Sequence, residues 1–93
     1  AAEDNIGVMY EHGQGVEQDY AEAMKRYRIS AAKGNGEAEL NIGNFYQHGL
    51  GVKLDLNEAI KWYRSAVSNG NEEAAQKLSA LNNGGAAQES HQE

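Results

Sequence analysis

The apolar residues in the middle of the chain recur at the spacing of an amphipathic helix. At positions i, i+4, i+7 and i+8 stand Ala38, Ile42, Phe45 and Tyr46. This spacing predicts a helix over about residues 36–48. A second apolar stripe comprises Ala59, Ile60, Tyr63, Ala66 and Val67. It predicts a partner helix over about residues 56–69, so the middle of the chain is expected to form a helical pair.

The whole pattern occurs twice. Laying residues 1–36 over residues 37–72 without a gap gives 18 identities in 36 positions, whereas composition alone would give roughly two or three. A period of 20 to 50 residues is typical of stacked supersecondary units, each of which buries its apolar face only against a neighbour. A third copy begins at Asn71 and keeps the apolar stripe for one helix.

The repeat therefore predicts one domain and a tail. We expect an all-α superhelix, an α/α solenoid of antiparallel helix pairs, with repeats at about 1–34 and 35–70 and a polar capping helix at 71–82. Residues 83–93 carry no apolar stripe and are expected to form a disordered tail.

Polar residues and glycines mark the helix ends. Asp55 and Glu58 have the spacing of a capping box, in which the two carboxylates accept from the first free amides of a helix, and residues 19–22 repeat it. Gly34 and Gly70 follow the last helical residues, where a left-handed conformation ends a helix. We therefore expect tight turns between the helices.

In one segment apolar and polar residues alternate as they do in a half-buried strand. Its alternating apolar residues are Leu50, Val52, Leu54 and Leu56. The same offsets in the first copy hold Gln14, Val16, Gln18 and Tyr20. Only the valine recurs, so we predict a loop over residues 49–54 with one valine inserted into the core. The three leucines lean outward, either as a binding patch or as a contact for the third-copy helix.

Two glycines recur inside the predicted first helix of each copy. A glycine there costs about 1 kcal/mol relative to alanine. Gly7 and Gly43 are therefore expected to let the partner helix approach closely.

The second copy combines glycines and aromatic residues in a specific order. In sequence these are Gly43, Phe45, Tyr46, Gly49, Gly51, Val52, Trp62 and Tyr63. Over residues 2–78 the chain resembles the Sel-one-like repeat, a relative of the tetratricopeptide repeat. The resemblance implies an α/α superhelix and a role as an adaptor in signalling or in the assembly of membrane and secretion complexes. The first copy differs from this order of residues at one position, because Arg26 stands at the offset of Trp62. This difference indicates incomplete packing there or a contact with a preceding repeat.

Composition excludes several classes of function. The formal net charge is −6, and no cluster of Lys and Arg occurs. Nucleic-acid binding is therefore not expected, because phosphate neutralisation by basic side chains supplies most of that affinity, and a basic or neutral protein surface fits better. No apolar stretch approaches the ~20 residues that cross a bilayer, so no membrane insertion is expected.

Candidate chemistry is sparse. His12 and His48 share one offset, but two ligands of one zinc lie within about 4 Å of each other, whereas stacked helices lie about 8–10 Å apart. We therefore expect no metal and no cofactor. Glu22 and Glu58 are accounted for by the capping boxes, and no serine has a histidine at helical spacing. We expect no enzyme, with a hydrolase as a remote alternative.

The remaining candidate is a surface that binds a peptide or another protein. We expect the first helix of each pair to line the concave side and to hydrogen-bond an extended peptide. The candidate residues are Asn5, Val8, His12, Leu40, Asn41, Asn44, Gln47 and His48. Alternatively, the chain is a structural scaffold segment of a longer repeat array, or a regulatory domain of an enzyme or membrane complex. End-to-end self-association through the first helix pair is also expected.

Overall fold

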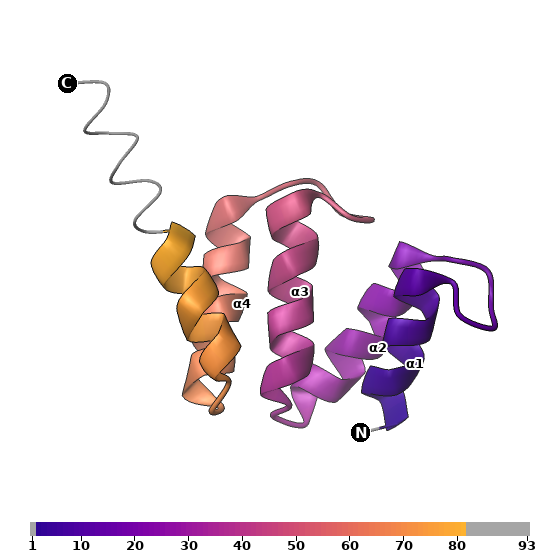
Figure 1. Cartoon of the computed structure of the whole chain (residues 1–93), viewed down its shortest axis with the longest axis horizontal. Coiled ribbons are helices and arrows are strands. Elements are labelled where there is room, and N and C mark those ends of the chain that lie inside the picture. The colour runs from indigo at the N-terminus through magenta and orange to yellow at the C-terminus, as the bar shows by residue number, and fades with distance from the viewer. Residues whose placement is uncertain (1, 82–93) are drawn as a thin grey trace.

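The computed structural model describes residues 2–81, with side chains from residue 6 onward. Within them the only regular elements are helices, namely α1 (Ala2–His12), α2 (Tyr20–Ala32), α3 (Gly36–His48), α4 (Leu56–Ser68) and a further helical segment at 72–81. In Figure 1 these helices follow one another along the molecule, and α1 packs on α2, α2 on α3, and α3 on α4. The predicted all-α solenoid is confirmed. None of the described helices is long and apolar enough to cross a membrane.

The predicted boundaries agree closely with the observed ones. α3 spans the predicted residues, α4 ends one residue before the predicted end, and residues 49–54 form a loop. Gly34 and Gly70 adopt φ values of 85° and 89°, in the left-handed region where glycine is favoured. The expected end of the capping helix at residue 82 and the expected tail at 83–93 lie outside the described residues.

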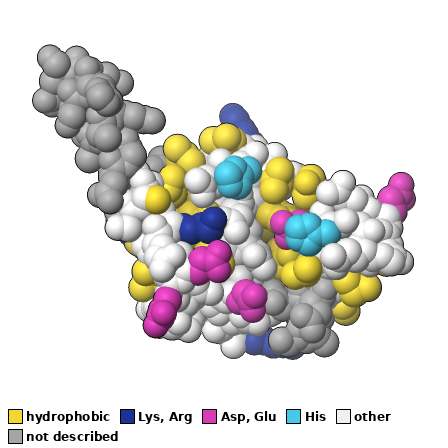
Figure 2. Space-filling view, viewed as in Figure 1, with side chains coloured by type: hydrophobic (Ala, Val, Ile, Leu, Met, Phe, Trp, Pro, Cys, Tyr) yellow, Lys and Arg dark blue, Asp and Glu magenta, His cyan; other side chains and the backbone are white. Residues whose placement is uncertain are grey.

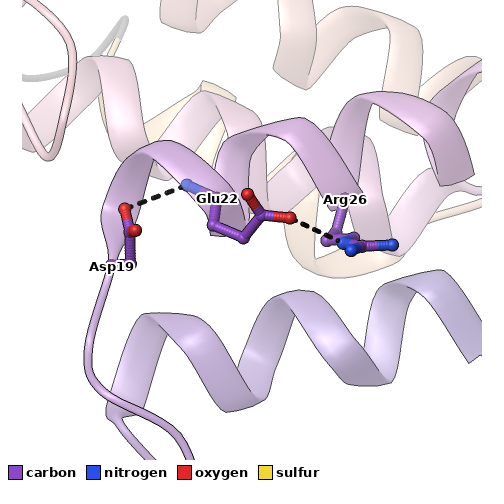
Figure 3. A network of polar contacts seen from close by, with 3 residues as sticks. All are labelled: Asp19, Glu22 and Arg26. Carbon is purple, nitrogen blue, oxygen red and sulfur yellow. Dashed lines mark hydrogen bonds and ion pairs between the residues drawn. The ribbon is translucent and has the colours of Figure 1, made fainter.

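Only one of the two contacts of each predicted capping box forms. Asp19 begins α2, and its carboxylate accepts from the backbone amide of Glu22 at 3.1 Å. The reciprocal contact is absent, because the amide of Asp19 donates to the carbonyl oxygen of Tyr10 at 2.9 Å. The carboxylate of Glu22 instead accepts from Nε of Arg26 at 3.0 Å (Figure 3). Asp55 makes the same two contacts in the second copy, so each cap also ties the loop to the preceding helix.

The two glycines that recur inside the first helix of each repeat lie under tyrosine rings. A Cβ built on Gly7 would lie 2.6 Å from Cε1 of Tyr27, and one built on Gly43 would lie 2.5 Å from Cε1 of Tyr63. Both rings are fully buried. The expected close approach is confirmed, and the approaching group is an aromatic ring.

Two clusters of buried residues make up the core. The first joins α2 to α3 through Ala23, Met24, Tyr27, Ala38, Ile42 and Phe45. The second joins α3, α4 and the helical segment at 72–81 through Leu40, Ala59, Tyr63, Ala66 and Ala74. Because α3 belongs to both clusters, it links the repeats into one continuous stack.

The loop leucines differ from one another. Val52 packs on the first cluster as predicted, and Leu50, which is half-buried, packs there too. Leu54 and Leu56 are 55% and 47% exposed. The expected outward patch is thus reduced to these two residues, because Leu50 packs against the core.

The departure at Arg26 also has a structural basis. Trp62 packs on the first cluster, that is, against the preceding repeat. The side chain of Arg26 instead pairs along its own helix with Glu22. Met9 at the same end of the stack is 38% exposed. End-to-end self-association through this region stays a prediction.

Candidate partner-binding face

Two histidines end the first helix of each repeat. His12 closes α1, His48 closes α3, and both side chains are exposed. A cationic imidazole is favoured at a helix C-terminus, where the carbonyl groups give a partial negative charge. Figure 2 shows the histidine side chains on one face of the molecule, with hydrophobic side chains beside them. Within residues 6–81 no group of three or more His, Asp or Glu side chains could hold a metal ion.

Val8 and Asn41 lie on the same two helices and are partly exposed. Val8 also packs against the first core cluster, so only part of its side chain is available to a partner. The side chain of Asn5 lies outside the described residues. Surface on α1 and α3 is therefore presented by His12, His48, Val8 and Asn41. We call these four residues the α1/α3 surface.

Asn44 and Gln47 are held by a tyrosine of the partner helix. The hydroxyl of Tyr63 lies 2.7 Å from Oδ1 of Asn44 and 2.6 Å from Oε1 of Gln47. A phenol has one proton to donate, so the second contact is satisfied when the other amide turns its N–H toward the phenolic oxygen. The two amides thus anchor Tyr63 above Gly43. Because both side chains remain partly exposed, their binding of a peptide stays a prediction.

The prediction that Leu40 contacts a partner is wrong, because this side chain is buried. Its side chain is 4% exposed and belongs to the second core cluster. The prediction treated α3 as a helix with one packed stripe, whereas α3 is covered by α2 on one side and α4 on another. A second neighbour widens the buried face, and Leu40 lies within it.

Glu39 has a structural role that the apolar pattern did not reveal. It is 5% exposed. Its carboxylate accepts from Oγ of Ser65 at 2.6 Å and from Nδ2 of Asn69 at 2.8 Å, which joins α3 to the end of α4. The recurrence of glutamate at Glu3 and Glu39 was the available signal.

Charge is divided between the two kinds of helix. α1 and α3 contain five acidic residues and no Lys or Arg. α2 and α4 contain two acidic residues and five basic ones. The basic residues are Lys25, Arg26, Arg28, Lys61 and Arg64. The helices that carry the α1/α3 surface therefore favour a neutral or basic partner.

Burial changes the acid–base behaviour of Tyr63. It raises the pKa of this phenol from 10.0 to about 12. Below pH 10 the phenol is neutral in both the folded and unfolded chain, so its stabilising contribution is fully present. Above pH 10 the unfolded chain loses the proton first, and the unfolding free energy falls by about 1.4 kcal/mol per pH unit toward pH 12. Urea denaturation at pH 9 to 12 should show this slope, and Tyr63→Phe should lack it. Equal slopes in the two proteins would contradict the assignment to Tyr63.

Comparisons with known proteins agree with this architecture. A sequence model of the Sel1 repeat matches residues 1–35 and 36–71. The crystal structure of a Sel1 repeat protein from Oxalobacter formigenes is similar, with 38% identity, a TM-score of 0.80, and coverage of 83% of this chain and 31% of that one. Also similar is c5321, a protective antigen of uropathogenic Escherichia coli strains with an SLR fold, with 42% identity, a TM-score of 0.79, and coverage of 82% and 16%. No curated protein sequence matches significantly.

The two matched repeats coincide with the two helical pairs and their loops. The chain spans about a third or less of the length of these two solved relatives. Sel1 repeats generally mediate protein–protein interactions and are typically non-catalytic scaffolds. With two tandem repeat matches and two solved structures of the same architecture, this chain belongs to the Sel1 repeat family.

Proposed function

We infer that the chain is a non-enzymatic module that binds a neutral or basic segment of a partner protein on the α1/α3 surface. The single observation that carries this proposal is the recurrence of an exposed histidine at the C-terminal ends of α1 and α3. Identical groups at a fixed spacing suit a partner with an extended, regularly spaced backbone.

The surrounding residues support the same partner chemistry. α1 and α3 hold five acidic residues and no Lys or Arg, so a positive segment is attracted and an acidic one is repelled. Val8 adds a partly exposed apolar contact, and Asn41 adds an amide that can donate and accept. The α1/α3 surface thus offers hydrogen bonding with a modest apolar contribution.

The experiment selects peptides that bind the chain from a displayed random library and measures their affinity. We expect the peptides that bind the α1/α3 surface to be neutral or basic, and we expect the triple variant His12→Ala, Asn41→Ala, His48→Ala to weaken their binding by roughly tenfold or more, about 1.4 kcal/mol. Lys61→Ala is the control, since its side chain is 74% exposed and belongs to α4, not to α1 or α3.

Asn44 and Gln47 are left intact in this design because their loss would release Tyr63 and confuse stability with binding. Circular dichroism checks that the triple variant stays folded. If a folded triple variant binds as tightly as the parent chain, the α1/α3 surface is not the binding site.

A further inference from the structure

Three side chains from three different helices meet at the junction of the repeats. Nη2 of Arg28, on α2, donates to the hydroxyl oxygen of Tyr46, on α3, at 2.9 Å. The guanidinium carbon of Arg28 lies 6.0 Å from the centre of the Trp62 ring, on α4, within the range of a cation–π contact. We call these residues the Arg28 cluster.

The two rings that hold Arg28 are themselves fixed. Trp62 and Tyr46 are half-buried, and both pack against the first core cluster. Tyr46 also packs against the second cluster, so its ring is held from both repeats. An arginine held on such a support loses less side-chain freedom on binding a ligand than one extended into water.

The cluster has hydrogen-bond donors to spare. A guanidinium carries five N–H groups, and one contact to Tyr46 uses a single nitrogen. The Tyr46 hydroxyl accepts in that contact, so its own proton is available. Among residues 6–81 no carboxylate lies within ion-pair distance of Arg28. The one acidic residue of α2, Glu22, forms its ion pair with Arg26. Arg28 is exposed to solvent.

We propose that the Arg28 cluster binds a carboxylate from an acidic segment of a partner protein. One carboxylate oxygen accepts from the free N–H groups of Arg28 and the other accepts from the Tyr46 hydroxyl, while the Trp62 ring supports the guanidinium. The carboxylate comes either from an Asp or Glu side chain or from a chain terminus. Because the cluster uses none of the four residues of the α1/α3 surface, the two proposals can fail separately.

The repeat supplies a matched control. Arg64 stands at the offset of Arg28, one period later, on the equivalent helix α4, and it is also exposed. The offset of Tyr46 holds Asn82 in the third copy. Arg64 therefore has the same charge and helical setting without a tyrosine hydroxyl at the corresponding position.

The test titrates the whole chain with three short peptides at low salt. The first is acetyl-Gly-Glu-Glu-Gly-amide, the second replaces both glutamates with glutamine, and the third is the glutamine peptide with a free terminal carboxylate. Binding is followed through the indole N–H resonance of Trp62, the one tryptophan of the chain. The first and third peptides separate a side-chain carboxylate from a terminal one, and saturable binding of either supports the proposal.

We expect Arg28→Ala to weaken binding by roughly tenfold, because it removes the charged donor, and Tyr46→Phe to weaken it by about threefold, because it removes one neutral donor. Arg64→Ala should change the affinity by less than about twofold. The amidated glutamine peptide should not bind. The proposal is overturned if no peptide shifts the indole resonance saturably, or if Arg64→Ala weakens binding as much as Arg28→Ala, which would indicate a diffuse effect of charge.

Discussion

Replacing Phe45 with alanine is expected to lower the unfolding free energy by about 3–5 kcal/mol. The ring is fully buried and meets the rings of Tyr20 and Tyr27 edge-on, with centroids 5.6 and 5.5 Å apart. These two tyrosines belong to the preceding repeat, so truncation opens a cavity where α3 packs on α2. Urea denaturation followed by circular dichroism measures the loss.

The first copy provides the control for Phe45. Met9 stands at the same offset and is 38% exposed, so Met9→Ala should cost less than about 1 kcal/mol. Small domains have only about 5–15 kcal/mol of stability, so Phe45→Ala is at risk of unfolding the chain. Phe45→Leu keeps most of the volume and should cost about 1.5 kcal/mol. Equal losses for Phe45→Ala and Met9→Ala would show that the contact between repeats is not the stabilising one.

Gly43→Ala is expected to destabilise the chain by about 1–3 kcal/mol, although alanine is the better helix former by about 1 kcal/mol. The new Cβ would lie 2.5 Å from Cε1 of Tyr63. The ring cannot swing away cheaply, because its hydroxyl is held by Asn44 and Gln47. The sign of the change in unfolding free energy therefore decides whether the close approach outweighs helix propensity.

A double variant tests the cause. Tyr63→Leu removes the ring edge, so adding Gly43→Ala to that background should be neutral or stabilising, which gives a coupling energy above about 1 kcal/mol. Gly34→Ala is a second comparison, because its Cβ would meet nothing within 4 Å and only the left-handed φ of 85° is strained. Stabilisation of the parent chain by Gly43→Ala would refute the steric account.

The sequence by itself determined the features that depend on local chemistry. The 36-residue period and the apolar stripes predicted α3 and α4 to within a residue, because helix formation is governed by side chains three and four positions apart. The cap at Asp19 followed from a carboxylate placed next to free amides. The glycine at position 43 predicted a close approach, because only a packing partner explains a recurring helix-weakening residue.

The tertiary structure decided which side chains remain free. Leu40 became core because α3 has a neighbour on two sides, which one helical stripe does not reveal. Asn44 and Gln47 became supports of Tyr63, whose hydroxyl lies 16 to 19 positions away in sequence. The contact between Arg28 and Tyr46 spans 18 positions. Such pairs depend on how far and at what angle the helices pack, and no local pattern encodes that geometry.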